Sequence, residues 1–337
     1  MPSDLTIRAM RAPADYDAVA DLLTRCGDTV TAADLAGQDA AMPPHGALST
    51  DDDGRLVGHD RVRYVCPGDG GLVGYAVAWR APWTPAGVVA SAVSVDPRQH
   101  AGAAHRALLE GLHSWASRIG AEQIMCEVAD HDEAGLRLLA ACGYRSRAHV
   151  CEATAPIPAD AASAGDTHAT ARGPVRLTSI ADEPAPGRAA ELYQLYLDTL
   201  PDNPGHIDSV PAFDDWRREV LDGDGCRPDW LFLALHDDRV VGVCHLRTTD
   251  DPYTAHNDYT AVARAWRGHG IARALKLHAA GQAARSGIRS MRTEVEAANR
   301  AMLAVNDRLG YQRGRGHHRM VRTCGCDAGE SAEIHAG

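Results

Sequence analysis

The pattern of hydrophobic and polar positions is clearest in the second half of the chain. Apolar residues recur every three or four positions in 188–200, which is the spacing of one face of an α-helix. Two apolar runs, 230–235 and 240–246, flank the polar turn 236–239 and predict a β-hairpin. The full pattern predicts the order ααβββαβαβ, with elements at 188–200, 216–221, 230–235, 240–246, 259–263, 273–285, 290–295, 299–308 and 311–321.

The first half of the chain repeats this pattern. When the sequence is shifted by 167 positions, residues 95–144 align with 262–311 without a gap, and 13 of the 50 aligned pairs are identical. Many identities fall at element ends, and the period is far too long for a solenoid, so we predict two tandem copies of one domain. The predicted boundaries are a first copy at 1–152, an irregular linker at 153–174, a second copy at 175–322 and a disordered tail at 323–337.

Composition narrows the class of protein. The length of 337 residues predicts about two domains, and a net charge of −11 argues against broad nucleic-acid binding. The acidic excess suits a cationic small substrate, although solvated surface carboxylates account for most of it. No signal peptide and no run of about 18 apolar residues is visible, so we expect no membrane association.

Two residue types add to this picture. The nine cysteines are scattered, as expected of reduced thiols in the cytoplasm. Lysine occurs once, as Lys276, and arginine supplies the other positive side chains, which is typical of a GC-rich bacterial genome.

A glycine-rich loop follows the apolar run 259–263. Its residues are Arg267, Gly268, His269, Gly270, Ile271 and Ala272. Glycines let the backbone approach a phosphate closely, and the first N–H groups of the helix that follows can donate to an anion. The spacing matches neither a P-loop nor the dinucleotide fingerprint, so the loop predicts a pyrophosphate site of another type.

The pattern Arg-x-x-Gly-x-Ala in this loop resembles the acyl-CoA pyrophosphate loop of the GNAT N-acetyltransferase superfamily. The resemblance covers both halves and is strongest in the second, where Leu309-Gly310-Tyr311 also follows in family order. It implies an α/β (α+β) protein with two tandem GNAT folds, each a mixed, mostly antiparallel sheet flanked by helices. The arrangement is similar to that of mycothiol synthase, but residues 292–299 do not closely match that enzyme.

The same resemblance implies an activity. An acyltransferase of this superfamily moves an acetyl group from acetyl-CoA to a primary amine by direct attack, without a metal. We expect a small-molecule acceptor, such as an antibiotic or another secondary metabolite, and a monomer or homodimer. A protein or peptide N-acetyltransferase and a non-catalytic acyl-CoA-binding pseudo-enzyme are the alternatives.

The resemblance also assigns groups to the cofactor. The N–H groups of 268–272 would hold the pyrophosphate, with added charge from Arg267. Backbone groups of Ala261, Val262 and Ala263 would pair with the pantetheine arm, and an N–H near Val262 would polarise the thioester oxygen.

Four side chains are candidates for the base that takes a proton from the amine. His256 and Asp258 precede the central strand on one face, and His256 lies eleven residues before Arg267, where some family members place their base. Glu294 and Glu296 lie on or just past the next strand and could act through water. The alternatives are an exposed turn histidine and surface or interdomain ion pairs.

The group that protonates the leaving thiolate is missing from its usual place. In the family it is often a tyrosine seven residues after the Asn that opens the last helix, and counting from Asn299 gives Asn306. The proton could come from water, from Tyr311 or from no specific group. The position of Tyr311 after Gly310 favours a role in core packing. Asn299 and Asn306 are expected to bind the pantetheine arm, with Asn299 also capping the helix.

The first copy lacks the features that hold phosphate. Its loop has His100 at the arginine position, Ala103 at a glycine position and the bulky His105 at a small-residue position, so we predict a non-catalytic domain that packs on its partner and shapes the substrate cleft.

Two further groups of residues have candidate roles. Several aspartates in the broken segment after the first helix are candidates to hold a cationic acceptor, or are turn formers: Asp198, Asp202, Asp208, Asp214 and Asp215. Cys324 and Cys326 are too closely spaced for a structural zinc pair, so no metal site is expected.

Overall fold

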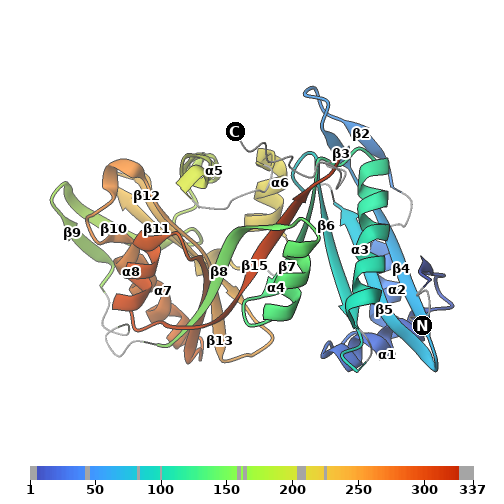
Figure 1. Cartoon of the computed structure of the whole chain (residues 1–337). Coiled ribbons are helices and arrows are strands. Elements are labelled where there is room, and N and C mark those ends of the chain that lie inside the picture. The colour runs from blue at the N-terminus through green and yellow to red at the C-terminus, as the bar shows by residue number, and fades with distance from the viewer. Residues whose placement is uncertain are drawn as a thin grey trace, which may run out of the picture.

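A 13-stranded sheet runs through both halves of the chain, with helices on its two faces (Figure 1). The computed structural model describes residues 6–41, 46–81, 84–98, 101–157, 161, 165–202, 210–223 and 226–325. The elements of the first half are β1 (Arg8–Ala9), α1 (Tyr16–Cys26), α2 (Ala32–Ala41), β2 (Leu48–Thr50), β3 (Leu56–Gly58), β4 (Asp60–Gly68), β5 (Gly71–Arg80), β6 (Val88–Val95), α3 (Ala101–Arg118), β7 (Gln123–Ala129), α4 (Glu133–Ala141) and β8 (Arg145–Pro156).

The second half contains the element order that the sequence pattern predicts. Its elements are β9 (Thr167–Thr170), β10 (Gly173–Ser179), α5 (Arg188–Thr199), η2 (Leu200–Asp202), α6 (Phe213–Arg217), η3 (Arg218–Asp222), η4 (Pro228–Trp230), β11 (Leu231–His236), β12 (Arg239–Thr248), β13 (Thr254–Val262), η5 (Arg264–Trp266), α7 (Ile271–Arg285), β14 (Ser290–Glu296), α8 (Arg300–Arg308) and β15 (Gln312–Thr323). The order ααβββαβαβ is therefore confirmed from α5 to β15.

The two halves repeat in structure as they do in sequence. The elements β7, α4 and β8 begin at residues 123, 133 and 145, and β14, α8 and β15 begin at 290, 300 and 312, which is the same spacing of 167. The repeat therefore reflects two copies of one fold rather than a chance match between Ala-rich helices.

The two copies exchange their last long strands. In the strand order β6-β7-β15-β8-β14-β13, the last strand of the second copy lies between β7 and β8 of the first. Equally, β8 of the first copy pairs antiparallel with β14 of the second, for example at Val295 opposite Cys151. The strands β8 and β15 also pair with each other at the centre of the molecule (Figure 1). Each half of the sheet is thus completed by a strand from the other half of the chain.

The predicted linker and tail are partly wrong. Residues 153–156 belong to β8, 167–170 form β9, and β10 begins at 173, so the predicted boundary at 152 falls inside a strand. Ala153 and Ala155 are buried in the core that contains α7. The prediction failed because small residues beside proline and glycine have the composition of a linker. Thr323, predicted to open the tail, ends β15, and residues 326–337 lie outside the described part of the chain.

Both faces of the second half of the sheet are covered. Helix α7 covers one face, where Leu275 packs in a core with Cys244 of β12. Helices α5 and α6 cover the other face, where Leu195 and Trp216 pack with Val243. Because successive side chains alternate along a strand, the neighbours Val243 and Cys244 point into opposite cores. The two faces of the sheet are therefore covered by different cores in this half of the chain.

Candidate functional site

The strands β13 and β14 separate partway along their length. They pair in parallel as far as Asn257 and Thr293, and the ladder ends there. On its other edge, β13 carries a bulge at Asp258, which has no partner in the ladder with β12. Beyond this point the backbone of β13 faces a gap where the next strand would otherwise lie.

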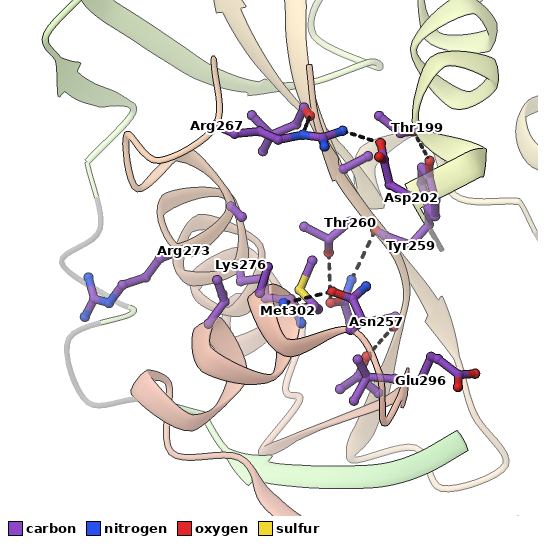
Figure 2. A pocket seen from close by; sticks show the side chains of 18 of the residues that line it. Thr199, Asp202, Asn257, Tyr259, Thr260, Arg267, Arg273, Lys276, Glu296 and Met302 are labelled. Carbon is purple, nitrogen blue, oxygen red and sulfur yellow. Dashed lines mark hydrogen bonds and ion pairs between the residues drawn. The ribbon is translucent and has the colours of Figure 1, made fainter. Parts of the chain in front are cut away.

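A cavity of about 770 Å³ fills this gap. It extends from the separated strands to the N-terminus of α7, and its walls come from β13, the glycine loop, α7, β14 and α8 (Figure 2). Val150 of β8 and Arg319 of β15 also line it, so both exchanged strands contribute to its wall. A site at this position depends on the two copies together.

The glycine loop forms one end of the cavity. Gly268 and Gly270 both have a φ of +78°, a left-handed conformation that favours glycine. Gly270 is also the N-cap of α7, so no side chain caps the first N–H groups of this helix. These loop residues line the cavity together with Ile271 and Ala272. The end of the helix is therefore open to an anion.

Strand β9 supports the loop from outside. The Nε2 atom of His168 lies 2.8 Å from the carbonyl oxygen of His269, and a Cβ added at Gly270 would lie 3.2 Å from the same nitrogen. His269 is not among the residues that line the cavity. The segment predicted as a linker thus braces the loop, and His269 serves this contact through its backbone.

The side chain of Arg267 is already paired. Its Nη2 atom lies 2.5 Å from a carboxylate oxygen of Asp202, and its Nε donates to the carbonyl of Val262 at 3.1 Å (Figure 2). The hydrogen bond from Arg267 holds the pKa of the Asp202 carboxyl below its ordinary value. Both side chains line the cavity. An anion bound at the loop would therefore lie near an Arg267 side chain that already forms an ion pair with Asp202.

The backbone residues predicted for the pantetheine arm divide into two groups. Ala261 and Val262 line the cavity, and Ala263 does not. The N–H of Ala263 instead donates to the carbonyl of Val241 at 2.9 Å. The free edge of β13 therefore ends at Val262.

Three of the four candidate bases line the cavity, namely Asp258, Glu294 and Glu296, whereas His256 does not. Burial acts to raise the pKa of Asp258, but the hydrogen bond from His245 and the charge of Arg247 bring the net pKa below its ordinary value. Burial lowers the pKa of His256, which feels the charges of Asp258 and Glu294. His256 is therefore not part of the cavity wall, although its pKa responds to two carboxylates that are.

The two glutamates on β14 have different surroundings. Glu294 lies directly opposite Glu152 of β8 and near the guanidinium of Arg292, at 3.4 Å. Glu296 accepts a hydrogen bond from the backbone N–H of His149 at 3.3 Å. Both side chains carry negative charge into the same end of the cavity.

Asn299 and Asn306 have separate roles. Asn299 lines the cavity and caps α8, because its Oδ1 accepts the N–H of Met302 at 3.1 Å. Asn306 is buried and is not among the lining residues. Its Oδ1 accepts a hydrogen bond from Nζ of Lys276 at 2.7 Å. The cap is as predicted, whereas Asn306 reaches the cavity only through Lys276.

Lys276 is one of the cavity residues that the sequence analysis did not predict. It lies on α7, is buried, and lines the cavity (Figure 2). Burial lowers the pKa of Lys276 to about 8. Its position in the sequence could have indicated this role, because the single lysine of the chain lies between the apolar residues Leu275 and Leu277 of a helix.

Other predicted residues lie elsewhere. Of the five candidate aspartates, Asp202 lines the cavity, Asp198, Asp214 and Asp215 do not, and Asp208 is outside the described residues. Cys326 is also outside them, and the described residues bring no group of three or more His, Cys, Asp or Glu side chains together as metal ligands. No helix in the described ranges is long and apolar enough to cross a membrane.

The chain is similar to known acetyltransferases. Residues 189–311 match the acetyltransferase (GNAT) family. A GCN5-related N-acetyltransferase from Sphaerobacter thermophilus is 20% identical with a TM-score of 0.67, over 96% of this chain and 97% of that one. A tandem GNAT protein from the clavulanic acid biosynthesis pathway is 18% identical with a TM-score of 0.63, over 96% and 99%.

No curated protein matches the sequence. The two structural relatives establish the fold, and the family match over residues 189–311 includes the glycine loop. Residues 189–311 thus match the acetyltransferase (GNAT) family, and the whole chain shares the fold of these two structures, one of which is a tandem GNAT protein.

Proposed function

We propose that this protein transfers an acetyl group from acetyl-CoA to a primary amine of a small molecule. One observation carries the proposal. A single cavity joins the uncapped N-terminus of α7 to the gap between β13 and β14. The helix end suits a pyrophosphate, and the gap leaves a strand edge for an extended arm that ends in a thioester. A volume of about 770 Å³ is that of a small-molecule site.

The acceptor enters at the acidic end of this cavity. Asp258, Glu294 and Glu296 gather there, and carboxylates attract an ammonium group. The amine must lose a proton before it attacks the thioester carbon. We assign this proton to the group formed by His256, Asp258 and Glu294, because burial lowers the pKa of the His256 imidazole and leaves it neutral at pH 7. A backbone N–H of β13 near the point where the strands part polarises the carbonyl oxygen, rather than one near Val262, whose carbonyl accepts a hydrogen bond from Arg267 of the glycine loop.

Only the second copy is proposed to bind CoA. In the first copy, helix α3 begins at Ala101, so positions 101–103, which correspond to Gly268–Gly270, are already helical. Helix α3 thus begins about one turn earlier than α7, and the positions that form the glycine bend before α7 are part of the helix in the first copy. The first copy then serves the site by lending β8 to the cavity wall.

A specific observation favours a second candidate function. Asn306 has no proton to give, and a protein without an acid for the leaving thiolate could be an acyl-CoA sensor. Release of CoA from acetyl-CoA, measured with a panel of small primary amines and of peptides, separates the candidates. We expect turnover with a small amine. Tight binding without turnover of any acceptor would favour the sensor, and turnover of peptides alone would favour a peptide acetyltransferase.

The variant Gly270→Asp tests the loop itself, with Gly270→Asn as its matched control. Both side chains have the same shape, so strain in the left-handed backbone and contact with His168 are shared. Only the aspartate adds a negative charge beside a phosphate, a repulsion worth several kcal/mol. Calorimetry should give measurable CoA binding for Gly270→Asn and none for Gly270→Asp. Equal affinities in the two variants would remove the pyrophosphate from this loop.

A further inference from the structure

A charged and a polar side chain are buried together beside the cavity. Lys276 of α7 is 4% exposed and Asn306 of α8 is 2% exposed, and they are joined by the hydrogen bond of 2.7 Å. Lys276 lines the cavity and thus has one side against the protein and one side toward a ligand (Figure 2). Burying an ammonium is costly, so its presence calls for a physical reason.

The first copy of the fold shows that packing is not the reason. The positions that correspond to Lys276 and Asn306 are Leu109 and Leu139, which lie in the apolar core of the first half and are 1% and 3% exposed. The same fold is therefore stable with two leucines at these positions. The charged pair belongs to the copy that holds the glycine loop.

The neighbours of Lys276 leave it without a counter-ion. Within the described ranges no carboxylate forms an ion pair with it, and its ammonium lies 4.9 Å from the ring centroid of Tyr311. Lys276 is also close enough to Cys244 of β12 to interact with it electrostatically. The sulfur of Cys244 accepts hydrogen bonds from Asn257 and Thr260 of β13. Burial raises the pKa of both Cys244 and Tyr311, so both groups are neutral around pH 8.

Spare donors remain at this point. The amide Nδ2 of Asn306 is buried without a partner, and an ammonium has three N–H groups, of which one donates to Asn306. Asn257 and Thr293, the last paired residues of the separating strands, line the same cavity as Lys276. Lys276 therefore offers a positive charge and free donors where the strands part, which is where a thioester lying along β13 would end.

We propose that Lys276 protonates the thiolate that leaves when the thioester is broken, with Asn306 holding the ammonium in position. This inference rests on the proposed acetyl transfer. The amine nitrogen forms a bond to the carbonyl carbon, the carbon–sulfur bond breaks, and its electron pair stays on sulfur. The sulfur takes a proton from Nζ of Lys276, and the neutral lysine regains a proton from solvent. The proton of the amine leaves through the base on the acidic side.

The chemistry of the two groups is matched. An ordinary thiol has a pKa of about 8.5, and burial brings the pKa of Lys276 to about 8. Proton transfer between groups of similar pKa has little thermodynamic cost in either direction, which is the condition for an effective general acid. A lysine with its ordinary pKa of about 10.4 would be a weaker acid.

The single lysine makes a direct test possible. Untagged protein labelled with ¹³C at the lysine ε carbon gives one signal, whose titration reports the pKa of Lys276 in the free protein, with CoA and with desulfo-CoA. Both ligands carry the same pyrophosphate, and only CoA brings a sulfur. We expect the midpoint to be higher with CoA by about one unit, because a nearby thiolate favours the ammonium.

Each outcome of the titration has a separate meaning. Equal midpoints in the two complexes would overturn the role of Lys276 and leave the proposed function standing. Failure of both ligands to bind would overturn the proposed function, and the inference with it. A higher midpoint with CoA alone would support the contact between the ammonium and the sulfur.

A double variant separates catalysis from packing. Lys276→Leu with Asn306→Leu copies the pair found in the first half, so the variant is expected to fold with unchanged thermal stability or better. We expect kcat to fall about 100-fold, with the KM for acetyl-CoA within about twofold. An unchanged kcat would overturn the proposal.

Lys276→Arg tests the proton, because arginine keeps the charge and does not titrate below pH 12. The acid must be protonated to act, so the kcat of the wild type should fall as pH rises through about 8. This alkaline fall should be absent in Lys276→Arg. If it persists, another group causes it.

Discussion

His256 and Asp258 differ in their ability to take a proton although they are two residues apart. The bulge at Asp258 turns its carboxylate toward Arg247 and His245, and these partners keep it charged. His256 lacks such a fixed partner among the contacts described, and burial lowers its pKa, so it is neutral and able to accept a proton at pH 7. Residues close in sequence thus have separate chemistry because the backbone between them is irregular.

The pH dependence of kcat/KM identifies the base. The folded pKa of His256 lies below its ordinary value of 6.5, so the neutral, active form is present above that pKa and is lost as pH falls through it. We expect an acid limb with a midpoint below 6.5, and we expect His256→Asn to remove it and lower kcat/KM by about 100-fold or more. In the parallel variant Glu294→Gln the limb should remain. Loss of the limb in that variant instead would assign the base to Glu294.

The sequence predicted part of the site at this scale. Gly268, Gly270 and Asn299 have conformations or caps that local spacing specifies, and all three line the cavity. Lys276 could not be predicted, because a lysine beside apolar residues on a helix is usually placed with its stem buried and its charge in water. Its partner Asn306 lies on a different helix, and local patterns do not identify contacts between helices.

Strand β15 connects the two copies at the scale of elements. Its residue Met320 is buried in the apolar core of the first half with Leu108 and Ile124, although it lies far along the second half of the chain. Conversely, Ala153 and Ala155 of β8 lie in the core of the second half. The stability of each core therefore depends on residues of the other copy.

The variant Met320→Ala tests this dependence. Removal of a buried methionine side chain should cost about 2–5 kcal/mol of unfolding free energy, measured by denaturant titration. Hydrogen exchange should show reduced protection in α3, which belongs to the first half. The control Val321→Ala removes a less buried side chain and should cost less. A loss of protection confined to the second half would contradict a shared core.

The order of the elements was predictable, whereas the exchange of strands was not. Periodicity reveals whether a segment is a helix or a strand, because it depends only on which faces are buried. It does not reveal which strand lies beside it, since β8 would satisfy its own apolar positions next to either β7 or β14. The short strand β9 was also missed, because its sequence Thr167–Thr170 is polar and lies at a sheet edge.

At the scale of the whole molecule, the two copies share one sheet but differ in their sites. The cavity lies in the second copy, and Val150 and Arg319 of the exchanged strands complete its wall. The first copy has buried leucines where the second has Lys276 and Asn306. We therefore expect a pseudosymmetric molecule with one competent site.

The number of bound CoA molecules tests this asymmetry. Calorimetry of the full chain should give one CoA per chain, because α3 lacks the glycine bend that opens the helix end. His105→Ala, which shortens a side chain in the first turns of α3, should change the affinity by less than about twofold. A second equivalent of CoA that disappears in His105→Ala would show a working site in the first copy.

The exchange of β8 and β15 also bears on how such a protein can change over time. After a duplication, a redundant copy is usually free to be lost. Here each copy holds a strand that lies within its sister's sheet, so deletion of either copy would remove a paired strand from the sheet of the other. The loop of the first copy differs from that of the second, whereas its last strand remains part of the second copy's sheet, so the first copy keeps a structural task without a glycine loop.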